Sequence, residues 1–285
     1  MSSEETDPAT QRAEMLERWE RAAAGWGRRA HSLRTSAMPV SVWMLDHAGL
    51  QPGQRVLELA AGPGDTGFLA AELIRPGTLI CSDAAEAMLE VAKERARELG
   101  IENVEFRRLE LEWIDLPTAS VDAILCRWGL MLTLDPAAAL QEARRVLRPG
   151  GRLALAVWDD VSRNPWATIP NRALIEHGHA KPPEPGEPGP FALSAPGELR
   201  GLIESAGFLD VLVEAVDVAR HHSSLDEFIA ETLDLSMMFS GAFTKLSEAE
   251  QNEVKQTMAS LAAPFTGADG AIALPGTSLG AAAHA

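Results

Sequence analysis

One segment points to the architecture before any other: Val56-Leu57-Glu58-Leu59-Ala60-Ala61-Gly62-Pro63-Gly64-Asp65-Thr66-Gly67. Its apolar start is typical of a short buried strand, and its glycines are typical of a tight turn into a helix. Glycine has no Cβ, so a bulky ligand can approach the backbone, and a helix begins with unpaired N–H groups. The segment therefore predicts a strand–turn–helix unit that binds a nucleotide-like ligand.

Two ligand classes fit this unit. Gly62, Gly64 and Gly67 match the G-x-G-x-x-G pattern of dinucleotide sites, which leaves an NAD(P)-dependent oxidoreductase open. Glu58 favours a different ligand, because a buried carboxylate repels a pyrophosphate and attracts a cationic group. The chain has no tyrosine, so the Tyr-x-x-x-Lys pair of many such oxidoreductases is absent. A purely local role for Glu58, as acceptor for a loop N–H, is the alternative.

Composition excludes several classes of function. The chain has 285 residues, of which 46% are hydrophobic, enough for a full core. A net charge of −16 argues against nucleic acid as a partner, because phosphate binding needs a basic face. The polar, acidic residues 1–10 do not resemble a signal peptide, and no apolar run is long enough for stable membrane insertion.

The two cysteines, Cys81 and Cys126, lie in apolar, strand-like runs with no metal-binding spacing. Cysteine in such a run is usually a small hydrophobic residue. We therefore expect a cytoplasmic protein without a disulfide or a metal site.

Strands and helices alternate between residues 55 and 158, which predicts a parallel sheet covered on both faces. The expected strands and helices are 55–60, 67–73, 77–82, 84–99 with Gly100 as its C-terminal cap, 104–108, 122–127, a helix capped by Asp135 with Pro136 in its first turn, and 152–158. Ligands of such sheets bind at the carboxyl ends of the strands.

The rest of the chain is divided by composition. We expect a disordered tail at 1–12, an N-terminal helical cap at 13–50 with helices over 13–33 and 39–48, and the ligand-binding core at 51–158. A proline-rich run at 181–190 indicates a lid or insertion within 159–206, which ends in a helix over 196–206. Residues 207–285 predict strands at 209–218 and 271–283 that flank a helical stretch at 225–262.

Two further acidic positions have chemistry that suits a nucleoside. Asp83 follows the second strand, where a carboxylate can accept both hydroxyls of a ribose. It equally suits the N-cap of the next helix, with Glu86 completing a capping box. After the third strand, Glu112 can accept from an adenine amino group, and Trp113 can donate its backbone N–H to the ring or pack against it. A surface loop with an acidic run is the alternative.

Taken together, these motifs resemble the class I S-adenosylmethionine-dependent methyltransferases, and most closely the small-molecule group that includes the quinone-biosynthesis methyltransferases. The motifs are Val56–Gly67, Cys81-Ser-Asp83, Glu112-Trp113 with Leu116-Pro117, Cys126-Arg-Trp-Gly129 and Glu142–Arg152. The resemblance covers about residues 50–158. It implies a Rossmann-like, doubly wound, mostly parallel seven-stranded sheet whose last strand is antiparallel, with N-terminal helices and a helical lid insertion.

The resemblance also implies a role for individual residues. Gly62 and Gly64 would let the methionine part of S-adenosyl-L-methionine cross the turn, and Glu58 would hold its ammonium group. The remaining cofactor contacts implied are Asp83 on the ribose, Ala84 and Met88 beside the adenosine, Glu112 and Trp113 at the adenine, Arg127 at the methionine moiety or the substrate, and Ala60 and Trp26 around the turn. The product would be S-adenosyl-L-homocysteine.

The sequence does not identify the catalytic residues, and the candidates are His221 and Arg127. An ion pair with a nearby acid is the alternative for Arg127, and an exposed, idle side chain is the alternative for His221. His177, His179 and His222 also lie within reach of the predicted pocket. No Ser-His-Asp order or zinc spacing indicates hydrolysis.

Large apolar residues give the expected substrate class. A set of them occurs on segments expected near the cofactor: Trp19, Trp26, Trp128, Trp166, Phe191, Met237, Met238 and Phe239. If these residues together line one apolar pocket, they favour a hydrophobic or aromatic small molecule as substrate. We expect O-, C- or N-methylation of such a molecule. A cofactor-binding protein without catalysis is a further alternative, and a homodimer stays open.

Overall fold

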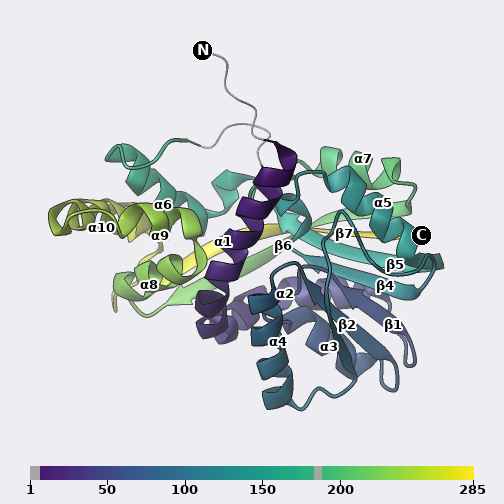
Figure 1. Ribbon diagram of the computed structural model, residues 1–285. Coiled ribbons are helices and arrows are strands. Elements are labelled where there is room, and N and C mark those ends of the chain that lie inside the picture. The colour runs from purple at the N-terminus through teal and green to yellow at the C-terminus, as the bar shows by residue number, and fades with distance from the viewer. Residues whose placement is uncertain (1–6, 183–187) are drawn as a thin grey trace.

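A computed structural model describes residues 7–182 and 188–285 (Figure 1). Seven strands form one sheet in the order β3-β2-β1-β4-β5-β7-β6. The strands are β1 Arg55–Glu58, β2 Thr78–Asp83, β3 Val104–Arg108, β4 Val121–Arg127, β5 Leu147–Trp158, β6 Leu209–His222 and β7 Ile272–His284. Strands β1 to β5 are parallel, and β7 is antiparallel to both of its neighbours. The expected mostly parallel sheet with an antiparallel last strand is confirmed.

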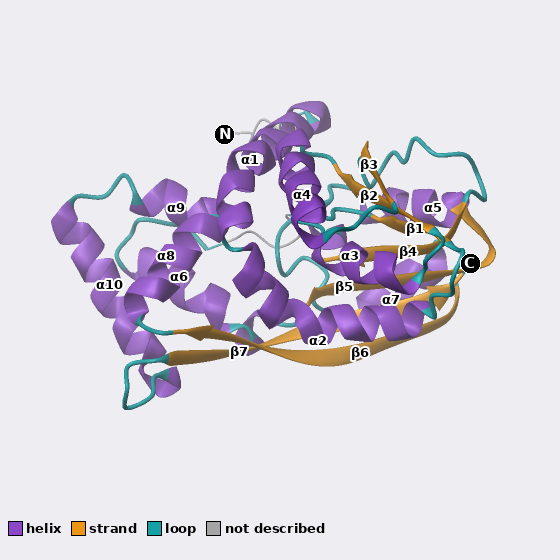
Figure 2. Ribbon diagram, turned by 90° about the horizontal axis from the view of Figure 1, so that it is seen from below, coloured by secondary structure: helices purple, strands orange, loops and turns teal. Residues whose placement is uncertain are grey.

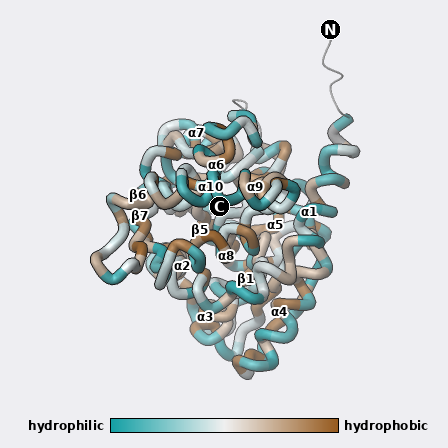
Figure 3. The backbone as a smooth tube through the Cα atoms, turned by 90° about the vertical axis from the view of Figure 1, so that its left-hand side faces the viewer, coloured by the Kyte–Doolittle hydropathy of each residue, from teal (hydrophilic) through white to brown (hydrophobic). Residues whose placement is uncertain are grey.

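Helices cover both faces of this sheet. Helices α2 Ala30–Ala48, α3 Asp65–Leu73 and α4 Glu86–Leu99 pack on one face, and α5 Pro136–Val146 and α7 Pro196–Ser205 pack on the other (Figures 1 and 2). The central strands are mostly apolar and almost fully buried, because helices cover both faces. Figure 3 shows a hydrophobic stretch of chain at β5, surrounded by helices that carry hydrophilic residues. Cys81 and Cys126 are buried in this core.

A second core lies beyond the far ends of β6 and β7, which extend as a two-stranded ribbon (Figure 2). It joins α6 Pro165–Glu176, α8 Leu225–Leu235, α9 Met237–Phe243 and α10 Glu248–Ala262. Ile272 and Leu274 of β7 are buried among these helices. Three short 3₁₀ turns complete the described chain: η1 Leu130–Leu132, η2 Val161–Arg163 and η3 Ala263–Phe265.

Helix α1 Pro8–Arg28 lies between α4 and α8, so it bridges the main sheet and the second core (Figure 1). Gly25 packs directly on the backbone of α8, where an added Cβ would stand 2.3 Å from the carbonyl oxygen of Asp234. The guanidinium groups of Arg28 and Arg29 contact the two carboxylate oxygens of Asp234 at 2.5 and 2.6 Å. These contacts fix the C-terminal end of α1 against α8.

Several element boundaries differ from those expected. Helix α1 begins at Pro8, inside the expected tail, and residues 1–6 lie outside the described chain. The break between α1 and α2 falls at Arg29, and Pro39 lies inside α2 because buried contacts on both sides of it outweigh the lost N–H. Strand β6 continues to His222, since its ribbon supports the second core. Part of the proline-rich run, 183–187, lies outside the described residues.

We expect Gly25→Ala to loosen α1 from α8. The added methyl has no room beside the Asp234 carbonyl, so the free energy of unfolding should fall by about 1–3 kcal/mol. Gly241→Ala is the matched control, because Gly241 lies in α9 with no heavy atom within 4 Å of an added Cβ. Urea unfolding of both variants checks this. Equal stability of Gly25→Ala and wild type would contradict the close packing of α1 on α8.

Candidate functional site

The glycine-rich turn lies at the carboxyl end of β1, where the strand order reverses between β2 and β4. Ala60, Gly62 and Gly64 have positive φ angles of 49°, 52° and 84°. The turn closes through the Gly64 N–H, which donates to the Ala61 carbonyl at 2.9 Å. Gly62 also leaves space, since the nearest atom to an added Cβ would be in the indole of Trp26, 3.9 Å away. The turn therefore presents open backbone beneath α1.

Asp83 fixes this turn to the end of β2. One carboxylate oxygen accepts from the Gly62 N–H at 2.9 Å, and the other accepts from the Ala85 N–H at 3.0 Å. Burial raises the pKa of Asp83, and the two backbone donors partly offset this effect. A carboxylate oxygen has more than one lone pair, so Asp83 keeps capacity to accept from a ligand.

The capping box expected from Asp83 and Glu86 is not formed. Helix α4 begins at Glu86, and its first amides are bound by a residue of α1 instead. The carboxylate of Glu20 accepts from the Glu86 N–H at 2.8 Å and from the Ala87 N–H at 2.9 Å. Sequence reasoning missed Glu20, because nothing local to α1 indicates which helix terminus it meets.

Glu58 is buried, with an exposed fraction of 3%. Its Oε1 accepts from the Gly67 N–H at 2.8 Å in the first turn of α3, so the local role named above is present. Its Oε2 has no hydrogen-bond partner among the described residues. An added Cβ at Gly67 would stand 2.1 Å from Oε2, so glycine is required there. Desolvation raises the pKa of Glu58 to about 8.

Arg127 takes part in a buried ion-pair network at the end of β4. Its guanidinium lies 3.6 Å from Asp65 and donates to the Ser41 hydroxyl at 3.0 Å. Asp65 also contacts Arg95 of α4 at 2.7 Å. Burial lowers the pKa of Arg127, and Asp65 and Glu58 counteract this effect. The ion-pair alternative for Arg127 is thus realised, and it connects α2, α3, α4 and β4 around the turn.

The loop after β3 brings Glu112 to the same edge of the sheet. The Glu112 carboxylate contacts Arg12 of α1 at 2.7 Å and accepts from the Asp135 N–H at 2.6 Å. The Trp113 residue is 75% exposed, and its backbone N–H donates to the Glu110 carbonyl. A surface cavity of about 510 Å³ lies here, lined by Arg12, Arg108, Leu109, Glu110, Glu112, Trp113 and Asp115.

Residues expected beside the adenosine lie under α1. Met88 is buried in a cluster with Ala22 and Ala23 of α1, while Ala84 is half-buried. Trp26 packs edge-on against Trp19 with ring centroids 5.6 Å apart, and its Nε1 has no partner among the described residues. Helix α1 therefore covers this part of the site.

The expected single apolar wall is wrong, because its eight members lie in four different places. Trp19, Trp26 and Met237 pack between α1 and α4, Phe239 lies in the second core, and Met238 is 51% exposed. A continuous aromatic wall does form from Trp128, Trp158, Trp166 and Phe191, with successive ring centroids 4.1, 4.7 and 6.2 Å apart. Trp158 was missed because it reads as an ordinary strand end.

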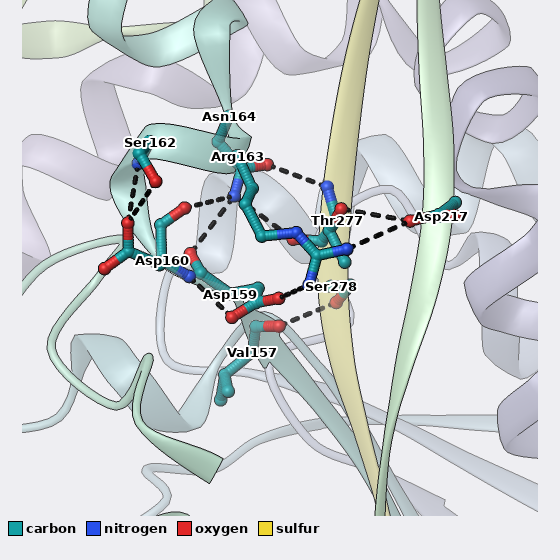
Figure 4. A network of polar contacts seen from close by, with 9 residues as sticks. All are labelled: Val157, Asp159, Asp160, Ser162, Arg163, Asn164, Asp217, Thr277 and Ser278. Carbon is teal, nitrogen blue, oxygen red and sulfur yellow. Dashed lines mark hydrogen bonds and ion pairs between the residues drawn. The ribbon is translucent and has the colours of Figure 1, made fainter.

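Two indoles of this aromatic wall donate hydrogen bonds to a network of polar residues, and Figure 4 shows that network without the indoles. The buried Asn164 amide donates to three carbonyls, those of Asp159, Asp160 and Thr277. Its oxygen accepts from the Thr277 N–H and from the Trp166 indole N–H. Ser278 donates to the Val157 carbonyl and accepts from the Trp128 indole N–H at 2.9 Å. The indole N–H groups of Trp128 and Trp166 are therefore hydrogen-bonded to buried partners.

The histidines do not gather at the turn. His221 is exposed on β6, and His222, on the opposite face, lies 3.2 Å from Glu231 of α8. His177 bonds Thr257 of α10 at 2.9 Å, and its ring stacks with that of His179. No cluster of His, Cys, Asp and Glu suited to a metal ion occurs among residues 7–182 and 188–285. In the same ranges no helix is long and apolar enough to cross a membrane.

Comparison with known proteins agrees with this geometry. Residues 50–182 match the model of a methyltransferase domain family. The ubiquinone/menaquinone biosynthesis C-methyltransferase UbiE of Pasteurella multocida is 33% identical over 129 residues, which cover 45% of this chain and 48% of that protein. UbiE of an Escherichia coli strain is 37% identical over 111 residues, which cover 38% and 44%. The chain thus spans less than half the length of these curated relatives.

Solved structures share the fold over most of the chain. The YcgJ protein from Bacillus subtilis is 20% identical with a TM-score of 0.59, and the match covers 86% of this chain and 97% of that one. The solved structure shows the shared fold, and the family model and the UbiE relatives show the kind of domain. Residues 50–182 therefore form an S-adenosylmethionine-dependent methyltransferase domain, distantly homologous to the UbiE quinone C-methyltransferases.

Proposed function

We propose that this protein transfers the methyl group of S-adenosyl-L-methionine to an apolar or aromatic small molecule. The observation that carries the proposal is the arrangement at the glycine-rich turn. Open backbone at Gly62 lies between Asp83 and α1, and the buried Glu58 has one carboxylate oxygen without a partner. These residues fit the cofactor, because an ammonium needs a carboxylate and a ribose needs a hydrogen-bond acceptor.

Each residue has a distinct task in this proposal. Glu58 binds the ammonium group, Asp83 accepts from the ribose hydroxyls, and Glu112 with Trp113 contacts the adenine at the surface cavity. Gly62 and Gly64 let the methionine part approach the backbone beside Ala60, and Ala84 with Met88 lines the adenosine. Arg127 either meets the methionine carboxylate or orients the turn through Asp65, which it already contacts.

Positioning and exclusion of water are the chain's main contribution to the reaction. S-adenosyl-L-methionine, when bound, supplies an activated methyl group on a positively charged sulfur, and transfer leaves S-adenosyl-L-homocysteine. Helix α1 covers the turn with its own Trp26 and packs on Met88 of α4, and so shields the turn from solvent. The aromatic wall from Trp128 to Phe191 begins next to the turn, because Gly129 packs closely on Ala60. This wall can orient a planar acceptor toward the methyl group.

The relatives and the chain's own aromatic residues bear on the methyl acceptor in different ways. The UbiE relatives are named as quinone-biosynthesis C-methyltransferases, which is a statement about those proteins. An aromatic acceptor for the present chain is supported by its own wall of indole rings. The acceptor atom, carbon, oxygen or nitrogen, depends on the molecule bound there.

We expect calorimetry to show binding of S-adenosyl-L-homocysteine and no binding of NAD. Asp83→Asn should weaken binding of S-adenosyl-L-homocysteine by about 1–3 kcal/mol, because a charged acceptor for the ribose is lost. Asp210→Asn is the matched control, since Asp210 is 82% exposed at the opposite end of the sheet, beside His284. Tight NAD binding with no response to S-adenosyl-L-homocysteine would overturn the proposal.

We also expect Glu58 to make stability depend on pH in the absence of ligand. Its pKa of about 8 lies above the ordinary 4.5, so the folded state keeps a proton that the unfolded chain has lost. Stability relative to Glu58→Gln should therefore fall as pH rises from about 5 to 8 and then level off. Urea unfolding of both proteins between pH 5 and 9 measures this. If the curves of stability against pH for wild type and Glu58→Gln run parallel, the pKa of Glu58 is not raised by folding.

A further inference from the structure

The ribbon end of β6 carries a buried cation that the proposed methyl transfer does not use. Arg220 lies on the same face of β6 as His222, while His221 points outward. The Arg220 side chain is only 12% exposed. Its guanidinium carbon lies 4.0 Å from the ring centroid of Trp166 and 5.8 Å from that of Trp158. The charge is therefore placed directly against the aromatic wall.

The hydrogen bonds of this guanidinium are not satisfied within the described chain. Its closest acid is Glu231 of α8, whose Oε1 lies 3.6 Å away, beyond hydrogen-bond length. Both oxygens of Glu231 already have other partners, His222 at 3.2 Å and the Ser32 hydroxyl at 3.1 Å. Among residues 7–182 and 188–285 no group accepts a hydrogen bond from the Arg220 guanidinium. A mostly buried guanidinium whose one acidic neighbour lies beyond hydrogen-bond length can still bind an acceptor, so a binding partner is expected.

A row of packed indole rings lies between Arg220 and the end of β4, next to the glycine-rich turn. Trp166, which lies under the guanidinium, packs on Trp158, and Trp158 stacks on Trp128. Trp128 follows Arg127 at the end of β4, and Gly129 touches Ala60 of the turn. The indoles thus form a row from Trp128, which lies beside Arg127, to Trp166, which lies under Arg220. A planar molecule bound beside this row would have one end towards the end of β4 and the other at the guanidinium.

We propose that Arg220 binds a carboxylate carried by a planar aromatic methyl acceptor. Arginine matches a carboxylate geometrically, with two parallel N–H donors for two oxygens, and desolvation strengthens such a pair. Stacking on Trp166 leaves the N–H edge of the guanidinium available for these donations. This inference rests on the proposed methyl transfer and names the substrate class of the same site. A purely structural Arg220 would only tie β6 to α8 through Glu231.

The test uses 4-hydroxybenzoate and its neutral analogue 4-hydroxybenzamide, titrated into the full-length protein saturated with S-adenosyl-L-homocysteine. Calorimetry and quenching of tryptophan fluorescence report binding without any need for turnover. The benzoate should bind about tenfold or more tightly than the benzamide. Arg220→Gln should abolish this difference while leaving binding of S-adenosyl-L-homocysteine unchanged. Arg172→Gln, on the exposed side of α6, is the matched control and should retain the difference.

A second variant keeps the test decisive if Arg220→Gln folds poorly. Glu231→Gln removes the competing negative charge while keeping an acceptor for Ser32, so it should raise the affinity for the benzoate severalfold. Equal binding of the two probes, absence of benzoate binding, or a preference that survives Arg220→Gln would each overturn the inference. These results are separable from failure of the proposed function, in which wild type would not bind S-adenosyl-L-homocysteine at all.

Discussion

The site depends on one buried carboxylate. Glu58 ends β1 in the centre of the sheet and accepts from the Gly67 N–H, which fixes the strand to the first turn of α3. This contact is possible only because Gly67 has no side chain. The second oxygen has no partner in the described chain, and burial makes Glu58 costly to ionise, so we propose that the ammonium group of the cofactor binds there. Asp83 then sets the turn beside it through the Gly62 N–H.

The surroundings of this carboxylate come from distant parts of the chain. Helix α1 supplies Trp26 above the turn and Glu20 at the start of α4, and it is anchored on α8 through Asp234. The same helix α8 supplies Glu231 beside Arg220 at the far end of the aromatic wall. The helix pair α1 and α8 therefore connects the glycine-rich turn with Arg220. We infer that the second core supports the acceptor pocket.

Local signals in the sequence predict local structure well here. The strand at 104–108, the Asp135 N-cap and the Gly100 C-cap are confirmed. The two caps depend on residues within one helical turn, and the strand has a short apolar pattern of its own. Contacts between distant segments could not be predicted. Glu20 at α4, Asp65 beside Arg127 and Arg220 over Trp166 all pair residues at least 50 positions apart. Grouping apolar residues by type also failed, since type does not say which of two cores buries them.

Proton release on cofactor binding tests the central claim most directly. At pH 7 the free protein should hold a proton on Glu58, and an ammonium bound there should displace it. Titration of S-adenosyl-L-homocysteine at pH 7, in two buffers of different ionisation enthalpy, counts the protons exchanged. The account predicts release of about one proton by wild type and none by Glu58→Gln. Binding of equal affinity with no proton released by either protein would contradict it.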